Sequence, residues 1–274
     1  MCLTHPEAAD TARIRASVLM VHGYGEHMGR YDEVTCAWTR AGFSVGRFDL
    51  RGHGQSGGLR GHVRHFGDYT LDLARVLAEL ARDPLWAASG RPIVFGHSLG
   101  ALIAVHYALE HQTELQGLAM TSPFFELARP VPSLKRALAQ TMSLLWPSYS
   151  QPNGIAGGCL TRDTELAERH ARDPLVQRRV TARWYVETAR AQRVALQLAP
   201  RLRLPVVCLA AGEDRIAGLS ATAQFFERIG ATHAKLDILQ GSRHEVLNEL
   251  DRDTSIAVLA HQFGDWAEYS GRQA

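Results

Sequence analysis

The sequence predicts an α/β fold in which a mostly parallel central sheet is flanked by helices. Short apolar runs rich in β-branched residues recur along the chain, and segments with helical spacing separate them. A length of 274 residues, of which 46% are hydrophobic, suits one domain with insertions. The expected strands are 17–21, 43–48, 92–95, 118–121, 206–210 and 236–239.

Helices are expected between these strands. Leu73, Leu77 and Leu80 recur at intervals of four and three residues, which places them on one face of a helix. The segment 99–110 has the same character and begins directly after the strand 92–95. A further amphipathic helix is expected at 254–269. Helices that cross between successive strands allow those strands to run parallel.

The alternation of strands and helices stops between residues 125 and 204. This segment contains Pro130, Pro132, Pro147 and Pro152, and a Gly-rich stretch at 153–158. Residues 128–204 carry 13 Lys and Arg against 5 Asp and Glu, whereas the whole chain carries 30 against 28. We therefore expect an α/β core formed by 1–124 and 205–274, and a basic helical cap, or lid, formed by 125–204.

Composition excludes several classes of function. A formal net charge of +2, without any long basic run, gives no support for a nucleic-acid partner. The four cysteines form neither a CxxC pair nor a zinc pattern, so we expect reduced thiols and no metal. Residues 1–16 lack the pattern of a signal peptide, and no apolar stretch reaches the ~18 residues of a membrane span. We expect a cytoplasmic protein that can contact membranes peripherally. The sequence does not determine its oligomeric state.

A candidate nucleophile lies in residues 96–100, which read Gly-His-Ser-Leu-Gly. They match G-x-S-x-G, the nucleophile elbow, in which a strained turn between a strand and a helix exposes the serine hydroxyl. Ser98 follows the strand 92–95 and precedes the helix 99–110, as this motif requires. Residues 54–58 also match, but Ser56 has no such setting. The alternative role for Ser98 is that of a helix N-cap.

A serine hydroxyl needs a base to accept its proton and an acid to orient that base. These partners follow the serine in the order acid, then histidine. Asp214 lies just after the strand 206–210 and is the preferred acid, with Glu213 as its competitor. Asp237 lies within an expected strand, so we interpret it as a surface residue.

The preferred base is His244, which follows the last expected strand, 236–239. The chain has 13 histidines, so position decides among them. His233 precedes that strand, and His261 lies in the middle of the helix 254–269. The alternative role for His244 is that of an ordinary loop histidine.

Acyl transfer also needs donors for the oxyanion, usually backbone N–H groups. The candidates are the N–H of Leu99, after the nucleophile, and that of Tyr24, in the run 22–27 (His-Gly-Tyr-Gly-Glu-His). The alternative is a Gly-rich turn without a catalytic amide. The polar segment 49–56 is expected to be structural, because it has neither metal-ligand nor phosphate-loop spacing.

Together these motifs resemble the monoacylglycerol lipase and lysophospholipase family, which is also grouped with the serine aminopeptidase-like hydrolases. The resemblance covers nearly the whole chain. Its residues lie at 22–27, 30–31, 48–56, 96–100, 121–123, 160–163 and 173–175, and in the loops of Asp214 and His244.

The resemblance implies an α/β-hydrolase fold and the hydrolysis of carboxylic esters, typically of glycerol or lysophospholipid. It implies a cap that forms a hydrophobic acyl tunnel over Ser98, Asp214 and His244, and it matches Leu99 and Tyr24 to the oxyanion positions. The chain departs from the family in two places. Ala101 stands where relatives commonly have glycine, and about sixteen residues precede the first strand, fewer than the usual leading hairpin needs.

The expected reaction is a cofactor-free, two-step hydrolysis through an acyl-enzyme. Peptidase, thioesterase and acyltransferase activities use the same chemistry and remain alternatives, as does a hydrolase-fold binding protein without catalysis. Epoxide hydrolase and dehalogenase chemistry is disfavoured, because those enzymes need Asp at the elbow.

A membrane hypothesis follows from the basic cap and its apolar residues Leu144, Leu145, Trp146, Trp184 and Tyr185. A helix with a basic face and an aromatic face can lie on an anionic interface. The alternative is a solvated arginine face.

Overall fold

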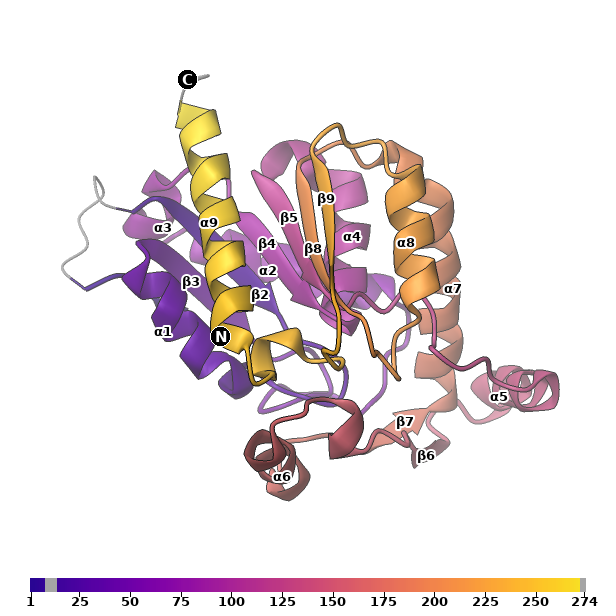
Figure 1. The fold of residues 1–274 in the computed structure, drawn as a ribbon. Coiled ribbons are helices and arrows are strands. Elements are labelled where there is room, and N and C mark those ends of the chain that lie inside the picture. Colours follow the sequence, from indigo (N-terminus) through magenta and orange to yellow (C-terminus); the bar gives the residue numbers. More distant parts are fainter. Residues whose placement is uncertain (8–13, 272–274) are drawn as a thin grey trace.

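The computed structural model describes residues 1–7 and 14–271 and is built around a seven-stranded sheet (Figure 1). In sheet order the strands are β1 (Cys2–Thr4), β3 (Phe43–Phe48), β2 (Ala16–Val21), β4 (Ile93–His97), β5 (Gly117–Thr121), β8 (Val206–Ala211) and β9 (Ala234–Leu239). Every neighbouring pair is parallel except β1 and β3. The predicted fold class is confirmed, and all six expected strands are present with ends that shift by at most two residues.

The N-terminal edge of the sheet contains a strand that was not expected. Cys2 to Thr4 pair antiparallel with Arg47 to Val45 of β3. Three residues show no alternation long enough to recognise, so their strand forms only because β3 offers a free edge. Residues 8–13 of the N-terminal segment, and 272–274 of the expected core, lie outside the described residues.

Helices cover both faces of the sheet (Figure 1). On one face α1 (Asp32–Arg40) and α9 (Arg252–Gly271) contact each other and the strands. On the other face α2 (Gly67–Leu80), α4 (Leu99–His111), α7 (Ala182–Leu198) and α8 (Leu219–Arg228) pack in succession. The short α3 (Pro84–Ala88) follows α2. The helices expected at 73–80, 99–110 and 254–269 correspond to α2, α4 and α9.

Aromatic side chains join α1, β4 and α9 beneath the sheet. The buried ring of Trp38 meets Phe95 at 5.3 Å and Phe263 at 4.9 Å between centroids, both edge to face. Its indole N–H donates to the carbonyl of Ile256 at 3.1 Å, so the polar atom is satisfied. This packing fixes β4, whose carboxyl end carries the candidate nucleophile.

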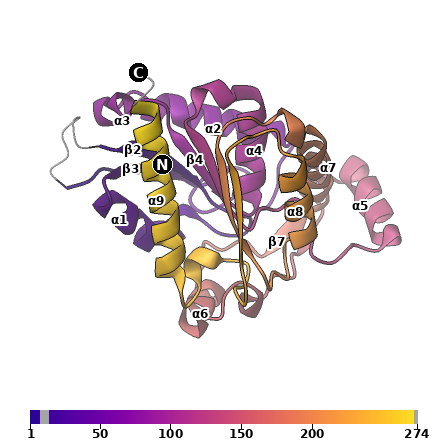
Figure 2. The ribbon, with the colours of Figure 1, turned by 45° about the horizontal axis from the view of Figure 1, so that its top comes forward.

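The segment 125–204 forms α5 (Ser133–Leu145), β6 (Ser150–Pro152), α6 (Thr164–Arg172), β7 (Arg179–Thr181) and α7. β6 and β7 pair antiparallel as a separate small sheet. Figures 1 and 2 both show α5 standing out from the body beside α7, and α6 below the carboxyl edge of the main sheet. α7 contacts α5 and also packs on α4 and α8, so it links the inserted segment to the core.

The exposed apolar surface of this segment lies mainly on α5. Its residues Leu134, Leu138, Leu144 and Leu145, and the following Trp146, are between 58% and 81% exposed. Trp184 was expected on the same surface, and this is wrong: it is buried and its ring packs on Tyr24 at 4.1 Å. In the described residues, no helix is both long and apolar enough to cross a membrane.

Two glycines allow α4 to begin directly against the sheet. A Cβ on Gly100 would lie 2.0 Å from the carbonyl oxygen of Val21 in β2. A Cβ on Gly96 would lie 2.5 Å from the backbone nitrogen of Ala101. Both contacts are with backbone, which cannot rotate away. The small residues of the elbow are therefore required by the close approach of helix and strand.

We expect Gly100→Ala to lower the free energy of unfolding by about 1–3 kcal/mol or more, because the added methyl group forces helix and strand apart. Urea denaturation measures this difference. Gly67→Ala is the matched control, because a Cβ there meets nothing within 4 Å. Equal losses of stability in the two variants would contradict the steric argument.

Candidate active site

Ser98 occupies a strained turn at the carboxyl end of β4. Its φ is 51° and its ψ is −113°, a region that non-glycine residues rarely adopt and that costs of order 1–3 kcal/mol. Hydrogen bonds hold the turn: the Ser98 N–H donates to Thr121 O at 3.0 Å, and its carbonyl accepts from Phe124 N at 3.1 Å. Ser98 is buried but lines a cavity at the carboxyl edge of the sheet. The strand-turn-helix setting expected for Ser98 is present.

The second match to the motif has a structural role. The Ser56 hydroxyl donates to the carbonyl of Asp49 at 2.6 Å. The Asp49 carboxylate accepts from Met28 N at 2.8 Å and from Gln55 N at 2.7 Å. The segment 49–56 therefore folds around one buried carboxylate, as expected.

His244 and Asp214 form a buried pair beside this turn. Nδ1 of His244 lies 2.6 Å from Oδ2 of Asp214, and both side chains are less than 5% exposed. The other carboxylate oxygen, Oδ1, accepts from Ile216 N at 2.8 Å and Ala217 N at 2.9 Å. These backbone donors fix the carboxylate, which in turn holds the imidazole. Glu213 is exposed, so Asp214 is the acid that contacts His244.

The pair shifts the protonation of both members. Burial works against the charged form of His244, but the charge of Asp214 and its hydrogen bond outweigh burial and raise the His244 pKa above 6.5. Burial likewise opposes ionisation of Asp214, yet His244 and the two backbone donors lower the pKa of this carboxyl. The site therefore stabilises the protonated form of His244, the imidazolium.

The residues rejected on sequence grounds lie elsewhere. Asp237 is in β9 and pairs with Lys235 at 2.8 Å, as expected for a surface residue. His261 is exposed on α9 beside Asp265. His233 directly precedes β9, and its carbonyl accepts from Val206 N at 2.9 Å.

The two candidate oxyanion donors flank Ser98. Leu99 is the first residue of α4, where helix N–H groups lack an internal partner. Tyr24 follows Gly23, on which a Cβ would lie 3.2 Å from Cβ of Ser98, so this loop passes directly over the serine. In residues 1–7 and 14–271, neither N–H makes a hydrogen bond within the chain.

His22 fixes the start of this loop. Its Nε2 accepts from Leu50 N at 2.9 Å, which leaves the proton on Nδ1 to donate to Gly23 O at 2.8 Å. Burial lowers the pKa of His22, so the ring stays neutral and this tautomer persists. The histidine that opens the run 22–27 is thus a structural link between two loops at the carboxyl edge of the sheet.

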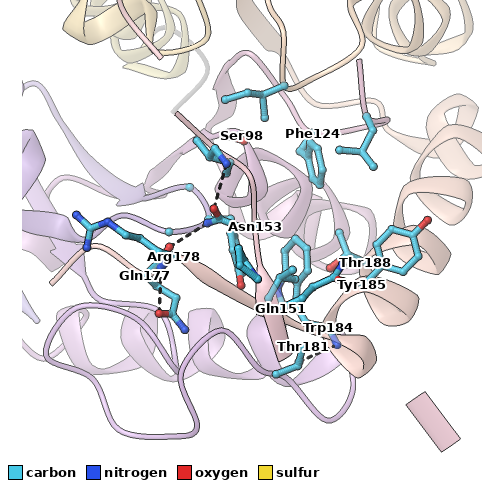
Figure 3. Close-up of a pocket in the computed structure, with 18 of the residues that line it drawn as sticks. Ser98, Phe124, Gln151, Asn153, Gln177, Arg178, Thr181, Trp184, Tyr185 and Thr188 are labelled. Atoms are coloured by element: carbon cyan, nitrogen blue, oxygen red, sulfur yellow. Dashed lines mark hydrogen bonds between the residues drawn. The ribbon is translucent and has the colours of Figure 1, made fainter. Parts of the chain in front are cut away.

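A cavity of about 560 Å³ opens over Ser98 and His244. In Figure 3 the polar residues Asn153, Gln177 and Arg178 lie on one side of it, and Phe124, Tyr185 and Thr188 lie on the other. Its apolar wall is completed by Leu127, Val131, Leu138, Ala139, Met142 and Ile216. The wall toward α5 is therefore mainly apolar, with Lys135 as its charged residue. The wall around β6 and β7 combines polar residues such as Asn153 and Gln177 with apolar ones such as Ile155 and Val180.

The inserted segment is tied to the loops of the site. The Tyr24 hydroxyl donates to Arg179 O at 2.6 Å, and Gly25 O accepts from Gln177 N at 2.9 Å. The Glu245 N–H, next to His244, donates to Leu160 O at 2.8 Å. Sequence reasoning placed this segment over the site but did not identify these contacts.

Sequence reasoning also missed four buried polar residues around the pair. Glu26 and Glu245 both contact Arg30, and the His97 ring lies 4.9 Å from that of His244 between centroids. Burial lowers the pKa of His97 to about 4, so it is neutral near pH 7. All four lie inside or next to the segments 22–31 and 96–100 and the loop of His244. The clustering of charged and histidine residues in these segments was the sequence signal that could have identified them.

The described residues contain no cluster of three or more His, Cys, Asp or Glu side chains arranged to hold a metal ion.

A strained serine after a parallel strand, followed along the chain by a buried carboxylate–histidine pair, defines the class of α/β-hydrolases. The serine aminopeptidase S33 model matches residues 12–251. The chain belongs to this family. The family resemblance found in the sequence is thus confirmed.

Individual relatives agree with this placement. The chain is 29% identical over 249 residues to an abhydrolase domain-containing protein of Dictyostelium discoideum, which covers 89% of this chain and 26% of the relative, so the chain spans about a quarter of that protein's length. It is 26% identical to the phospholipase YtpA of Bacillus subtilis, covering 87% of this chain and 91% of the relative.

Among solved structures, the monoacylglycerol lipase of Paleococcus ferrophilus superposes with a TM-score of 0.85 and 27% identity. The match covers 97% of this chain and 100% of that protein. Near-complete coverage of both chains means that the inserted segment is shared as well as the core.

We expect Asp214→Asn to lower the pKa of His244, because burial then acts without the opposing carboxylate charge. The wild-type value should lie above 6.5. NMR titration of the imidazole C–H signals measures both, and Glu213→Gln is the matched control that should leave the His244 pKa unchanged. A larger fall in Glu213→Gln than in Asp214→Asn would move the acid by one residue.

Proposed function

We propose that this chain hydrolyses carboxylic esters of lipid-like substrates, with Ser98 as nucleophile, His244 as general base and Asp214 as orienting acid. The observation that carries the proposal is the strained Ser98 beside the buried His244–Asp214 pair, under a cavity whose wall toward α5 is mainly apolar. The family membership and the lipase and phospholipase relatives support the same reaction.

The reaction proceeds in two steps. The Ser98 hydroxyl attacks the acyl carbonyl while His244 accepts its proton, and the imidazolium then gives that proton to the departing alcohol. The backbone N–H groups of Leu99 and Tyr24 stabilise the oxyanion. Water, activated by His244, attacks the acyl-enzyme and releases the acid and free Ser98.

The cavity supports a substrate with a long acyl chain and a small polar alcohol. The acyl chain lies along the apolar side, toward Met142 and Leu138, where burial of each CH₂ contributes about 0.8 kcal/mol. The polar alcohol lies toward Asn153 and Gln177. Monoacylglycerols have this shape, and lysophospholipids share the acyl chain but carry a larger, phosphate-containing polar group.

In this proposal residues 125–204 act as the cap over a core formed by 1–124 and 205–274. The exposed apolar side chains of α5 and Trp146 then contact a membrane from which the substrate enters. Arg129, which precedes α5, and Lys135 and Arg136, in its first turn, are exposed and attract an anionic surface.

We expect Ser98→Ala to lose on the order of 10⁶ in kcat while it remains folded, because the nucleophile of a triad acts as a unit with its partners. Hydrolysis of monoacylglycerols, lysophospholipids, p-nitrophenyl esters and aminoacyl amides provides the assay. Ser56→Ala is the control and should retain activity. Amide turnover far above ester turnover in the wild type would replace the lipase proposal with a peptidase one.

We expect the protein to cosediment with anionic but not zwitterionic liposomes, and salt to weaken this binding by screening. Leu145→Ala should weaken it about tenfold, because part of a buried apolar side chain is lost. Leu71→Ala is the matched control, since Leu71 is an exposed leucine on α2. Equal binding of both variants, or no binding of the wild type at low salt, would leave α5 without a membrane role.

A further inference from the structure

Three charged side chains lie buried next to the candidate triad. The side chains of Glu26, Glu245 and Arg30 are 3%, 5% and 10% exposed. Arg30 donates from Nη1 to Glu26 at 3.1 Å and to Glu245 at 2.5 Å, and from Nη2 to Glu245 at 2.7 Å. Buried ion pairs of this kind are often no more stable than well-packed apolar residues, because desolvation offsets their attraction. Their location therefore suggests a role besides stability.

Each end of this cluster holds a different catalytic loop. Glu26 accepts from the Gly23 N–H at 2.5 Å, one residue before the Tyr24 amide, and from the Tyr31 hydroxyl at 2.8 Å. Glu245 directly follows His244 and also accepts from Asn248 at 2.9 Å. Arg30 thus connects the loop over Ser98 to the loop of the base.

We propose that Glu26, Arg30 and Glu245 are positioning residues, which set the separation between the oxyanion donor and the base and supply negative charge that favours the imidazolium of His244. The inference rests on the proposed function, because it assigns these residues to the same hydrolysis. In this proposal none of the three side chains touches the reacting atoms.

The charge of the surroundings agrees with this role. Burial opposes ionisation of both glutamates, but His97 and Arg30 lower the pKa of Glu26, and Arg30 lowers that of Glu245. With Arg30 protonated, the cluster carries one excess negative charge. Asp214, which contacts His244, is ionised. Burial lowers the pKa values of His97, beside His244, and of His170, which lies near Arg30 and Glu245.

The test measures the rate at which a fluorophosphonate labels Ser98 as a function of pH. In the wild type this rate falls as pH falls through the His244 pKa, because only the neutral imidazole accepts the serine proton. We expect Glu245→Gln to reduce the high-pH plateau by roughly tenfold to a hundredfold, since small misplacements of catalytic groups have such effects. We also expect Glu245→Gln to move the midpoint of the pH profile to lower pH. The positive charge of Arg30 then disfavours the imidazolium of His244, because the Glu245 carboxylate no longer neutralises it.

Three further variants separate positioning from general loosening of the fold. Glu245→Asp keeps the charge and should restore the wild-type midpoint. Arg30→Gln should not move the midpoint to lower pH, because it removes positive charge. Asp72→Asn breaks another carboxylate–arginine pair, the one with Arg51, and should change neither plateau nor midpoint.

A folded Glu245→Gln variant with the wild-type plateau and midpoint would overturn the inference. If that variant does not fold, Glu26→Gln applies the same test from the other end of the cluster. NMR titration of His244 in the same variants reports the charge effect without any turnover. A wild type that hydrolyses no ester would therefore reject the proposed function, while a His244 pKa unmoved by Glu245→Gln would reject the positioning role.

Discussion

The close approach of α4 to the sheet at Gly96 and Gly100 is the constraint on which the site depends. The helix begins so close to the Val21 carbonyl that only glycine fits at position 100, and Ser98 makes the turn from β4 into this helix with a φ of 51°. The strain is held by the bonds of its backbone to Thr121 and Phe124, on both sides of the turn. The position of the serine is therefore fixed by backbone packing in the core rather than by its own side chain.

The inserted segment is also part of the site's support. Gln177 and Arg179 bind the loop that carries Tyr24, and Leu160 binds the backbone next to His244. A hydrogen bond of 2.8 Å between Nε2 of His27 and Oδ2 of Asp173 also joins the same loop to the segment. By contrast, α5 projects from the body with an exposed apolar face. The segment therefore combines a part that is fastened to the catalytic loops with a part that is open to its surroundings.

Environment gives similar histidines different roles near the serine. His22, His53 and His97 are buried without an ionised hydrogen-bond partner, and burial lowers the pKa of each, to about 3 for His53 and about 4 for His97. His244 is equally buried but is bound to Asp214, and its pKa is raised. One carboxylate, fixed by two backbone N–H groups, thus favours the imidazolium form of His244, whereas burial favours the neutral form of the other three rings.

The sequence by itself determined the parallel strands, the strand-turn-helix around Ser98 and the places of Asp214 and His244 after later strands, because these depend on short-range patterns and chain order. Only the tertiary structure decided that Asp214 rather than Glu213 reaches His244, that Trp184 is buried, and that β1 forms an edge strand. It alone joined Arg30 to Glu245, which lie 215 positions apart. Such contacts depend on how distant segments meet, and local periodicity contains no information about that.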